Sequence, residues 1–397
     1  MQLNLNPSIA GQRPNPMFRI GALVHGRADV IHLEFGEPDL PTPAHIVEAG
    51  LRSLRDERQG YGPGNGIASL RAAIAARVAR VDRFAAGPDQ VVVTPGGTGA
   101  LMAALLTLCV PGDEVLVPDP AWAGYDAMLA VAGARMVRYP LLAEAGWQPD
   151  LDALEAIMTP RARVLLINTP SNPGGAVYPR ATIARLLEIA RRHDLWLLSD
   201  ECYDEIVFAG EHVSPAALDA DEQSGRVLTV GTCSKSYAMT GWRVGWVVAP
   251  PAVTPGIALT TTAQVNNLPL FAQRAAEAAL TGPQECVRAM AASYRERRDL
   301  ALATLRAHGV AAHTPEGAFY LLVPVAELLP PSNVGRPFDG VTFAEELIAA
   351  RGIAVAPGAA FGTRAAGYMR ISLASSADDL SAGLDGLITF ARTYSQH

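Results

Sequence analysis

Residues 90–120, QVVVTPGGTGALMAALLTLCVPGDEVLVPDP, indicate the fold of this chain. The run contains a short apolar strand, a glycine pair, a helix that is apolar nearly all round, and a second apolar strand. Strands that are apolar without strict alternation, joined by a helix, are typical of a parallel sheet buried on both faces. The helix begins at the glycines, where amides and the positive helix end favour an anion. A tight turn capped by Thr98 is the simpler alternative.

The same pattern continues on both sides of this run. Further strands are predicted at 134–141, 163–170, 195–201, 226–232 and 245–250, and helices at 67–81 and 180–193. From about residue 276 the sequence pattern changes. It predicts a long charged helix (287–309), an apolar segment (317–325), a second helix (342–352) and a strand (368–374). We therefore expect an α/β fold with a mostly parallel sheet, followed by a smaller α+β domain.

The composition excludes several classes of function. Of the 397 residues 49% are hydrophobic and 18% charged, the net charge is −7, and no basic stripe marks a nucleic-acid site. No apolar run reaches the length of a membrane span, so we expect no membrane partner. The four cysteines lack metal-ligand spacing, and the N-terminus has no apolar signal core. We expect no metal and a cytoplasmic protein.

Four predicted strands are followed by loops that are rich in glycine or in functional groups. These loops are TPGGTGAL (94–101), NTPSNPGG (168–175), DECYDE (200–205) and GTCSKSYAMTGWR (231–243). Ligands of parallel sheets bind at the carboxyl ends of the strands, so these loops are expected to converge on one site.

Individually, the charged residues in these loops allow ordinary interpretations. Lys235 could be exposed, Asp200 could cap a helix, and Arg243 could form a structural ion pair. Taken together, these groups fit a single ligand. The helix end and the arginine suit a phosphate, the amine suits an aldehyde with which it can condense, and the buried carboxylate suits a basic ring nitrogen. These are the features of pyridoxal 5′-phosphate.

The chain resembles the fold-type I, pyridoxal-phosphate-dependent aminotransferases, the aspartate aminotransferase family. The likeness rests on seven motifs in the same order: FGEPDLPTP (35–43), YGPGNGIASLR (61–71), TPGGTGAL, NTPSNPGG, SDECYDE, SKSYAMTGWRVGW (234–246) and YMRISLA (368–374). The resemblance implies a three-layer transferase fold with a smaller α+β domain. It places an N-terminal arm and part of the small domain in 1–45, the large cofactor domain in 46–275 and the small C-terminal domain in 276–397.

The resemblance also assigns the catalytic residues. Lys235 would form the Schiff base with the cofactor and move the substrate proton. Asp200 would keep the ring nitrogen protonated, so that the ring withdraws electrons. Tyr203 and Asn172 would hydrogen-bond the phenolic oxygen of the cofactor.

Further residues are assigned to binding by the same resemblance. Trp122 would stack on the ring, although ordinary core packing is an alternative. The phosphate would be held by Gly97, Thr98, Thr232, Ser234 and Arg243. Tyr61 would reach the phosphate of a neighbouring subunit, which implies a homodimer with shared sites. The substrate carboxylate would bind Arg370, with Gly36 and Asn172 beside it.

The implied activity is a ping-pong transfer of an amino group from an L-amino acid to a 2-oxo acid. A lyase or synthase on the same scaffold, a cofactor-sensing regulator and a protein without cofactor remain alternatives. The chain departs from the family pattern at Gly174, where threonine is common, and at Asn266 and Asn267. No second arginine is placed for a dicarboxylate. Phe319, Tyr125 and the apolar entry segment (35–43) suggest a pocket for apolar or aromatic groups.

Overall fold

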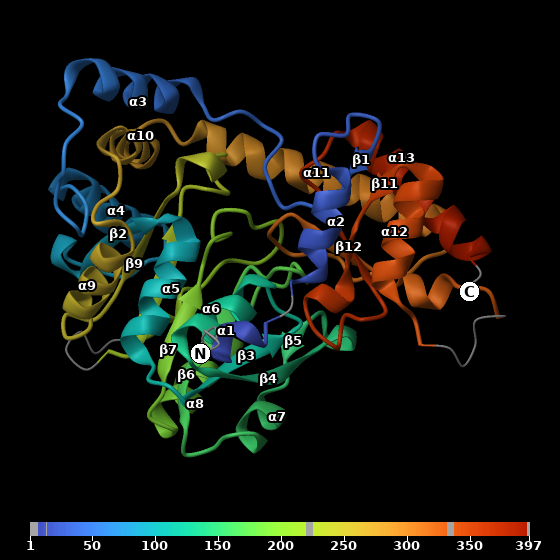
Figure 1. The fold of residues 1–397 in the computed structure, drawn as a ribbon, viewed down its shortest axis with the longest axis horizontal. Coiled ribbons are helices and arrows are strands. Elements are labelled where there is room, and N and C mark those ends of the chain that lie inside the picture. Colours follow the sequence, from blue (N-terminus) through green and yellow to red (C-terminus); the bar gives the residue numbers. More distant parts are fainter. Residues whose placement is uncertain (1–6, 13, 220–224, 332–336, 395–397) are drawn as a thin grey trace, which may run out of the picture.

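An eight-stranded sheet forms the centre of the computed structural model, which describes residues 7–12, 14–219, 225–331 and 337–394 (Figure 1). Its strand order is β2-β9-β8-β7-β6-β3-β4-β5. Strands β8, β7, β6, β3 and β4 pair in parallel, and β9 is antiparallel to both of its neighbours. The predicted mostly parallel sheet is therefore confirmed, although the predicted strand at 245–250 runs against the others.

The bounds of the elements follow. The strands are β1 Ile31–His32, β2 Val91–Pro95, β3 Glu114–Asp119, β4 Arg135–Leu142, β5 Gln148–Pro149, β6 Ala162–Asn168, β7 Trp196–Asp200, β8 Val227–Thr232, β9 Val244–Val248, β10 Tyr320–Val323, β11 Ile353–Ala354, β12 Ala356–Pro357 and β13 Met369–Ser372. The helices are α1 Pro7–Ala10, α2 Pro16–Val24, α3 Ala44–Asp56, α4 Ala68–Val81, α5 Gly96–Leu108, α6 Gly124–Ala132, α7 Leu151–Ala156, α8 Arg180–Arg192, α9 Thr254–Val265, α10 Leu270–Thr281, α11 Glu285–Ala307, α12 Gly340–Arg351 and α13 Ala377–Thr393.

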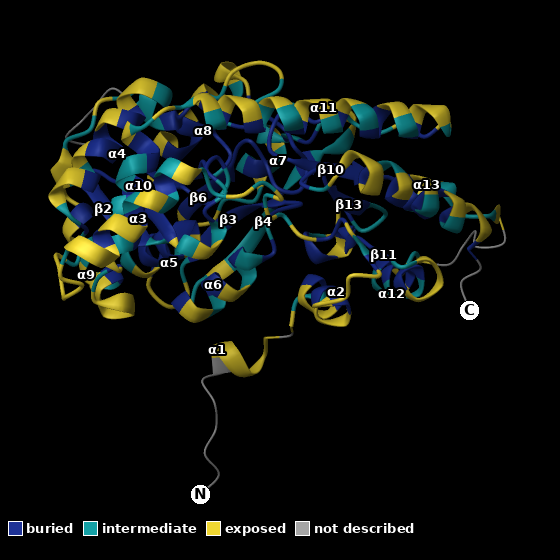
Figure 2. Cartoon of the chain, turned by 90° about the horizontal axis from the view of Figure 1, so that it is seen from above, coloured by how far each residue is buried: buried dark blue, intermediate teal, exposed yellow. Residues whose placement is uncertain are grey.

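Helices cover both faces of the sheet, which gives the predicted three layers. Leu166 of β6 packs in one core with residues of α5, α6 and α9. Its neighbours Leu165 and Ile167 point to the opposite face and pack with residues of α8. Figure 2 shows buried residues concentrated in the strands and exposed ones along the outer faces of the helices. Because successive side chains of a strand point to opposite faces, a doubly covered strand is apolar throughout.

A second group of elements lies at the other end of the long axis (Figure 1). It comprises α11, α12, α13 and the antiparallel sheet β10-β13-β12, and β1 pairs with β11. Ile20 and Leu33 from the N-terminal segment share its core with Leu347 and Leu384. The domain limits stay a prediction. The predicted boundary between the large domain and the small C-terminal domain, at residues 275 and 276, falls inside α10. We therefore propose that this boundary lies in the loop between α10 and α11.

The carboxyl ends of β2, β6, β7 and β8 lie at one edge of the large sheet, since these strands run in the same direction. The buried Arg77 of α4 anchors the loop that follows β7. Its guanidinium contacts Asp204 at 2.5 Å and Glu205 at 3.1 Å, and also Asp82 at 2.7 Å. This network holds the segment that carries Asp200 and Tyr203. In the described residues, no helix combines the length and apolar character that a bilayer crossing needs.

Candidate active site

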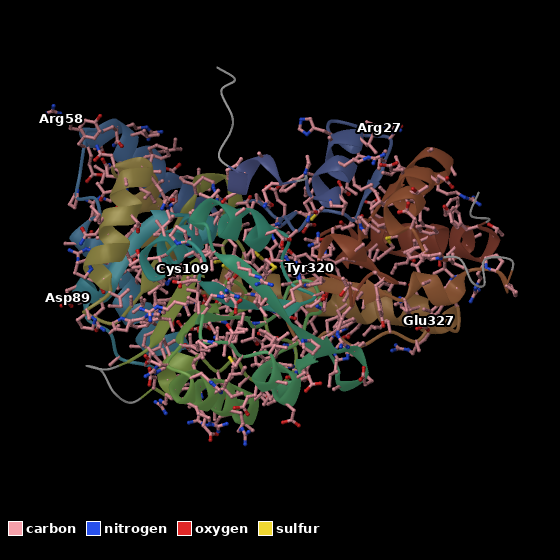
Figure 3. The ribbon with its side chains drawn as sticks, turned by 60° about the horizontal axis from the view of Figure 1, so that its bottom comes forward. Arg27, Arg58, Asp89, Cys109, Tyr320 and Glu327 are labelled. Atoms are coloured by element: carbon pink, nitrogen blue, oxygen red, sulfur yellow. The ribbon has the colours of Figure 1, made fainter. Side chains whose placement is uncertain are left out.

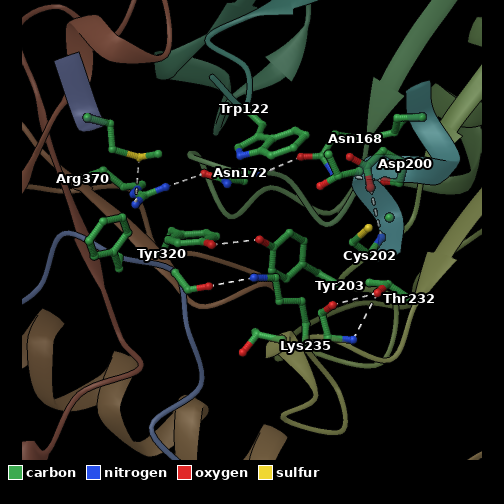
Figure 4. Close-up of a pocket in the computed structure, with 18 of the residues that line it drawn as sticks. Trp122, Asn168, Asn172, Asp200, Cys202, Tyr203, Thr232, Lys235, Tyr320 and Arg370 are labelled. Atoms are coloured by element: carbon green, nitrogen blue, oxygen red, sulfur yellow. Dashed lines mark hydrogen bonds between the residues drawn. The ribbon is translucent and has the colours of Figure 1, made fainter. Parts of the chain in front are cut away.

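A pocket opens at this edge of the sheet, and the predicted site residues other than Tyr61 line it (Figure 4). The lining residues that the sequence predicted are Gly36, Gly97, Thr98, Trp122, Asn172, Asp200, Tyr203, Thr232, Ser234, Lys235, Arg243 and Arg370. They come from the ends of β2, β3, β6, β7 and β8 and the loops after these strands, from the N-terminal segment and from β13. The convergence expected for the strand-end loops is therefore present, and a residue of the second group of elements joins it.

Lys235 is half-buried and directs its amine into the pocket. Its Nζ donates to the carbonyl of Gly36 at 2.7 Å and lies 6.0 Å from the centre of the Tyr203 ring and 5.8 Å from that of Phe319. No carboxylate in the described part of the chain pairs with it. An amine among aromatic rings and a carbonyl is available to react with an aldehyde.

Asp200 ends β7 and is buried. Burial raises the pKa of Asp200, while hydrogen bonds from Cys202 and Tyr125 oppose that rise. The Tyr125 hydroxyl donates to Oδ2 at 2.6 Å and the Cys202 amide to Oδ1 at 3.3 Å. The prediction that Tyr125 lines an apolar pocket is wrong, because Tyr125 is fully buried and is not among the residues that line the pocket.

Arg243 packs against the start of α5 and lines the pocket together with Thr232 and Ser234. Gly96 has a φ of 76°, and a Cβ there would lie 2.6 Å from Nη2 of Arg243. The Thr232 hydroxyl accepts a bond from the Ser234 amide at 3.1 Å. Arg243 itself has a φ of 56°, a costly conformation for a residue with a side chain, and its guanidinium donates to the carbonyls of Thr240 and Pro95. The structural ion pair considered for Arg243 does not occur in the described residues.

Arg370 lies at the opposite end of the pocket and is 2% exposed. Its Nη1 donates to Oδ1 of Asn172 at 3.0 Å and its Nη2 to the carbonyl of Glu34. Burial lowers the pKa of Arg370, and within the described ranges no carboxylate forms an ion pair with it. A buried guanidinium without an ion-pair partner favours an anionic ligand, and its fork matches a carboxylate.

Two aromatic rings hold the Arg370 guanidinium between them. Its Cζ lies 4.4 Å from the centre of the Tyr320 ring and 4.6 Å from that of Phe361. The Tyr320 hydroxyl lies 2.8 Å from the Tyr203 hydroxyl. Tyr320 was not predicted as a site residue. Its one signal was its position in the predicted segment 317–325, which gave no reason to expect a contact with Tyr203.

The remaining predicted residues differ in their surroundings. Trp122 lines the pocket and is half-buried, with its ring edge-on to Tyr125 at 5.3 Å. Phe319, which suggested an apolar pocket, is fully buried and does not line it. Phe35, the first residue of the entry segment, lines the pocket, and so does Met17, which was not predicted. Tyr61 is 91% exposed and lies outside the pocket of its own chain.

Comparison with known proteins identifies the family. The pattern of the family described as aminotransferase class I and II matches residues 28–387. The arginine–pyruvate transaminase of Pseudomonas aeruginosa is 38% identical over 366 residues, 91% of this chain and 90% of the relative. The aspartate/prephenate aminotransferase of Thermus thermophilus is 38% identical over 361 residues, 90% of each chain.

Solved structures give the same result. A single mutant of the Thermus thermophilus aspartate aminotransferase superposes with a TM-score of 0.89 at 35% identity, covering 98% of this chain and 100% of the other. The aromatic aminotransferase of Pyrococcus horikoshii has a TM-score of 0.85 at 31% identity, over 94% and 98% of the two chains.

The chain therefore belongs to the class I and II aminotransferases, and it is an aminotransferase. Its α/β architecture matches that of aspartate aminotransferase. The relatives are named as aminotransferases, so the lyase or synthase considered as an alternative is not favoured, and neither is a protein without catalytic activity.

Proposed function

We propose that the enzyme transfers an amino group from an L-amino acid to a 2-oxo acid with pyridoxal 5′-phosphate bound in this pocket. The charge balance of the pocket carries this proposal. Lys235, Arg243 and Arg370 line it without ion-pair partners, and Asp200 is the one acid among its described lining residues. Unpaired basic groups at the two ends of the pocket favour the binding of an anion at each end. A cofactor phosphate would bind near Arg243 and a substrate carboxylate at Arg370.

The pocket residues fit this cofactor group by group. Gly97, Thr98, Thr232, Ser234 and Arg243 would hold the phosphate at the N-terminus of α5, where backbone amides face the ligand. Asp200 would face the ring nitrogen, and a protonated ring nitrogen would favour the ionised form of the carboxyl, which burial disfavours. Tyr203 and Asn172 would bind the phenolic oxygen, and Trp122 would cover the ring.

The substrate end of the pocket fixes the reacting carbon. Arg370 would clamp the α-carboxylate in a bidentate contact, assisted by Asn172 and by the Gly36 amide. With the carboxylate held there, the Cα proton can be turned toward Lys235, whose amine would take it and return it at another atom. Bound pyridoxal phosphate supplies the aldehyde and an electron-withdrawing ring.

A half-reaction tests the proposed activity. The purified enzyme with cofactor is incubated with an L-amino acid and no acceptor, and one equivalent of 2-oxo acid per site is expected. Adding a second 2-oxo acid should regenerate the original visible spectrum and release its amino acid, as a ping-pong reaction requires. Continuous release of ammonia without an acceptor would instead indicate a lyase and would overturn the proposal.

Arg370→Lys should raise the KM for the amino acid by about 10- to 100-fold, because an ammonium keeps the charge and loses the fork. The turnover number at saturation should change much less, since the reacting atoms are untouched. Steady-state kinetics with two amino acids measures both values. An unchanged KM would remove Arg370 from the carboxylate site, and spectral titration with the cofactor serves as a control for folding.

We also propose a homodimer whose subunits share their sites. Tyr61 is 91% exposed, and the apolar Leu259 of α9 is 71% exposed, a combination that suits an interface. Sedimentation equilibrium should give twice the 41.8 kDa of one chain. Replacing Tyr61 by Phe should weaken cofactor binding by about threefold to tenfold, since one hydrogen bond to phosphate is lost. A fully active monomer would contradict shared sites.

We propose a cytoplasmic location. All four cysteines, Cys109, Cys202, Cys233 and Cys286, are free in the structure, as expected for a reducing compartment. Cell fractionation with antibody detection tests this location, and recovery outside the cytoplasmic fraction would refute it.

A further inference from the structure

Tyr320 connects the two ends of the pocket. It is the first residue of β10 and is 1% exposed. It lies in the middle of the molecule, where the large sheet meets the C-terminal elements (Figure 3). Its ring faces the Arg370 guanidinium at 4.4 Å, and its hydroxyl lies 2.8 Å from the Tyr203 hydroxyl (Figure 4). One side chain therefore contacts both the proposed carboxylate site and the proposed cofactor site.

The strand register places this side chain beside Arg370. In the antiparallel pair β10–β13, Tyr320 is opposite Ser372 and Leu322 is opposite Arg370. Residues two apart on a strand share a face, so Tyr320 and Arg370 are diagonal neighbours. Gly36 makes room for the hydroxyl, because a Cβ at that position would lie 1.8 Å from Oη of Tyr320. The carbonyl of this same glycine accepts the bond from Lys235.

The number of protons on the two phenols determines which of them donates the hydrogen bond between Tyr203 and Tyr320. Each phenol has one proton to donate. If Tyr203 donates its proton to the phenolic oxygen of the cofactor, Tyr203 must accept at its own oxygen, and Tyr320 is the donor at 2.8 Å. Hydrogen bonds in such a chain polarise one another, so donation by Tyr320 strengthens donation by Tyr203. The ionisable groups around Tyr203 are Tyr320, Cys202, Asp200, Lys235 and Arg370.

We propose that Tyr320 is a positioning residue that holds the Arg370 guanidinium with its ring and strengthens, with its hydroxyl, the hydrogen bond from Tyr203 to the cofactor. The inference rests on the proposed function. It assigns two separable tasks to one side chain, so two variants can separate them.

The hydroxyl is tested by titrating the visible absorbance of the cofactor-loaded enzyme with pH, in the absence of substrate. Tyr203→Phe removes a donor to the phenolate and should raise the apparent pKa of the spectral transition by about one unit. Tyr320→Phe should raise it by about 0.3 to 0.5 unit, through the weakened Tyr203 bond. The double variant should match Tyr203→Phe within about 0.2 unit, because the second hydroxyl acts only through the first.

The ring is tested by the KM for the amino acid. Tyr320→Phe keeps a ring on Arg370 and should leave the KM within about twofold of wild type. Tyr320→Leu removes the ring and should raise the KM by about tenfold. If the role of Tyr320 were purely structural, both variants would change the KM for the amino acid and the apparent pKa of the spectral transition together.

The possible failures are distinguishable. If Tyr203→Phe shifts the titration and Tyr320→Phe does not, the inference is overturned and the proposed function stands. Additive shifts in the double variant would also overturn it, because they would show independent action. If Tyr203→Phe leaves the titration in place, the proposed role of Tyr203 falls, and the coupling to Tyr320 falls with it.

Discussion

Lys235→Ala is expected to abolish amino transfer, with a loss of at least about 10⁴-fold in turnover, because the proposed role of Lys235 supplies both the amine that joins the cofactor and the base that moves the proton. The side chain is half-buried and its amine donates to one carbonyl, so alanine leaves no buried charge unpaired and the fold should persist. Quenched assays of 2-oxo acid formation measure the remaining turnover.

Covalent labelling separates this role from a general loss of structure. After borohydride treatment, wild type should gain the mass of one cofactor on the peptide that contains Lys235, and the alanine variant should gain none. Lys235→Arg is the matched control, because it keeps a cation that does not condense with the aldehyde at neutral pH. It should be as inactive as Lys235→Ala, and transfer close to wild type in either variant would refute the assignment.

Asp200→Asn should lower kcat/KM by about 10²- to 10³-fold, because a neutral amide cannot hold a proton on the ring nitrogen and the electron-withdrawing power of the ring is lost. The substitution preserves shape, and the Tyr125 hydroxyl that bonds Oδ2 at 2.6 Å can still donate to the amide oxygen. Stability should therefore change little compared with activity.

Exchange of the Cα proton with solvent measures the step in question directly. Asp200→Asn should slow this exchange by a similar factor, and Asp200→Glu, which keeps the charge, should recover part of it. Exchange at the wild-type rate in Asp200→Asn would show that Asp200 does not assist loss of the proton. A matching loss of cofactor affinity without slower exchange would assign Asp200 to binding alone.

The parallel sheet and its strand-end loops could be predicted because their signals are local. Strands β6 and β7 are apolar over several consecutive residues, which the doubly covered sheet requires, and the glycines at the start of α5 mark a close approach of backbone. The rule that parallel strands present their carboxyl ends at one edge then brings Asp200 and Lys235 to one pocket. The direction of β9 could not be predicted, because apolar composition does not encode strand orientation.

Side-chain partners in the site could not be predicted in the same way. Tyr125 and Asp200 are 75 residues apart, and Tyr203 and Tyr320 are 117 residues apart. Neither pair has a spacing signal, because each contact depends on how two separate elements pack. Tyr125 was consequently assigned to a pocket that it does not line, and Tyr320 was missed.

By itself, the sequence determined the α/β layers, the edge of the sheet where the pocket opens, and the reactive groups placed there, since periodicity, glycine positions and residue chemistry are properties of short segments. Only the tertiary structure decided the surroundings of those groups: the tyrosine beneath Asp200, the two rings around Arg370, and the exposure of Tyr61. These depend on packing between segments far apart in the chain, where the shape of the core, rather than local pattern, selects the neighbours.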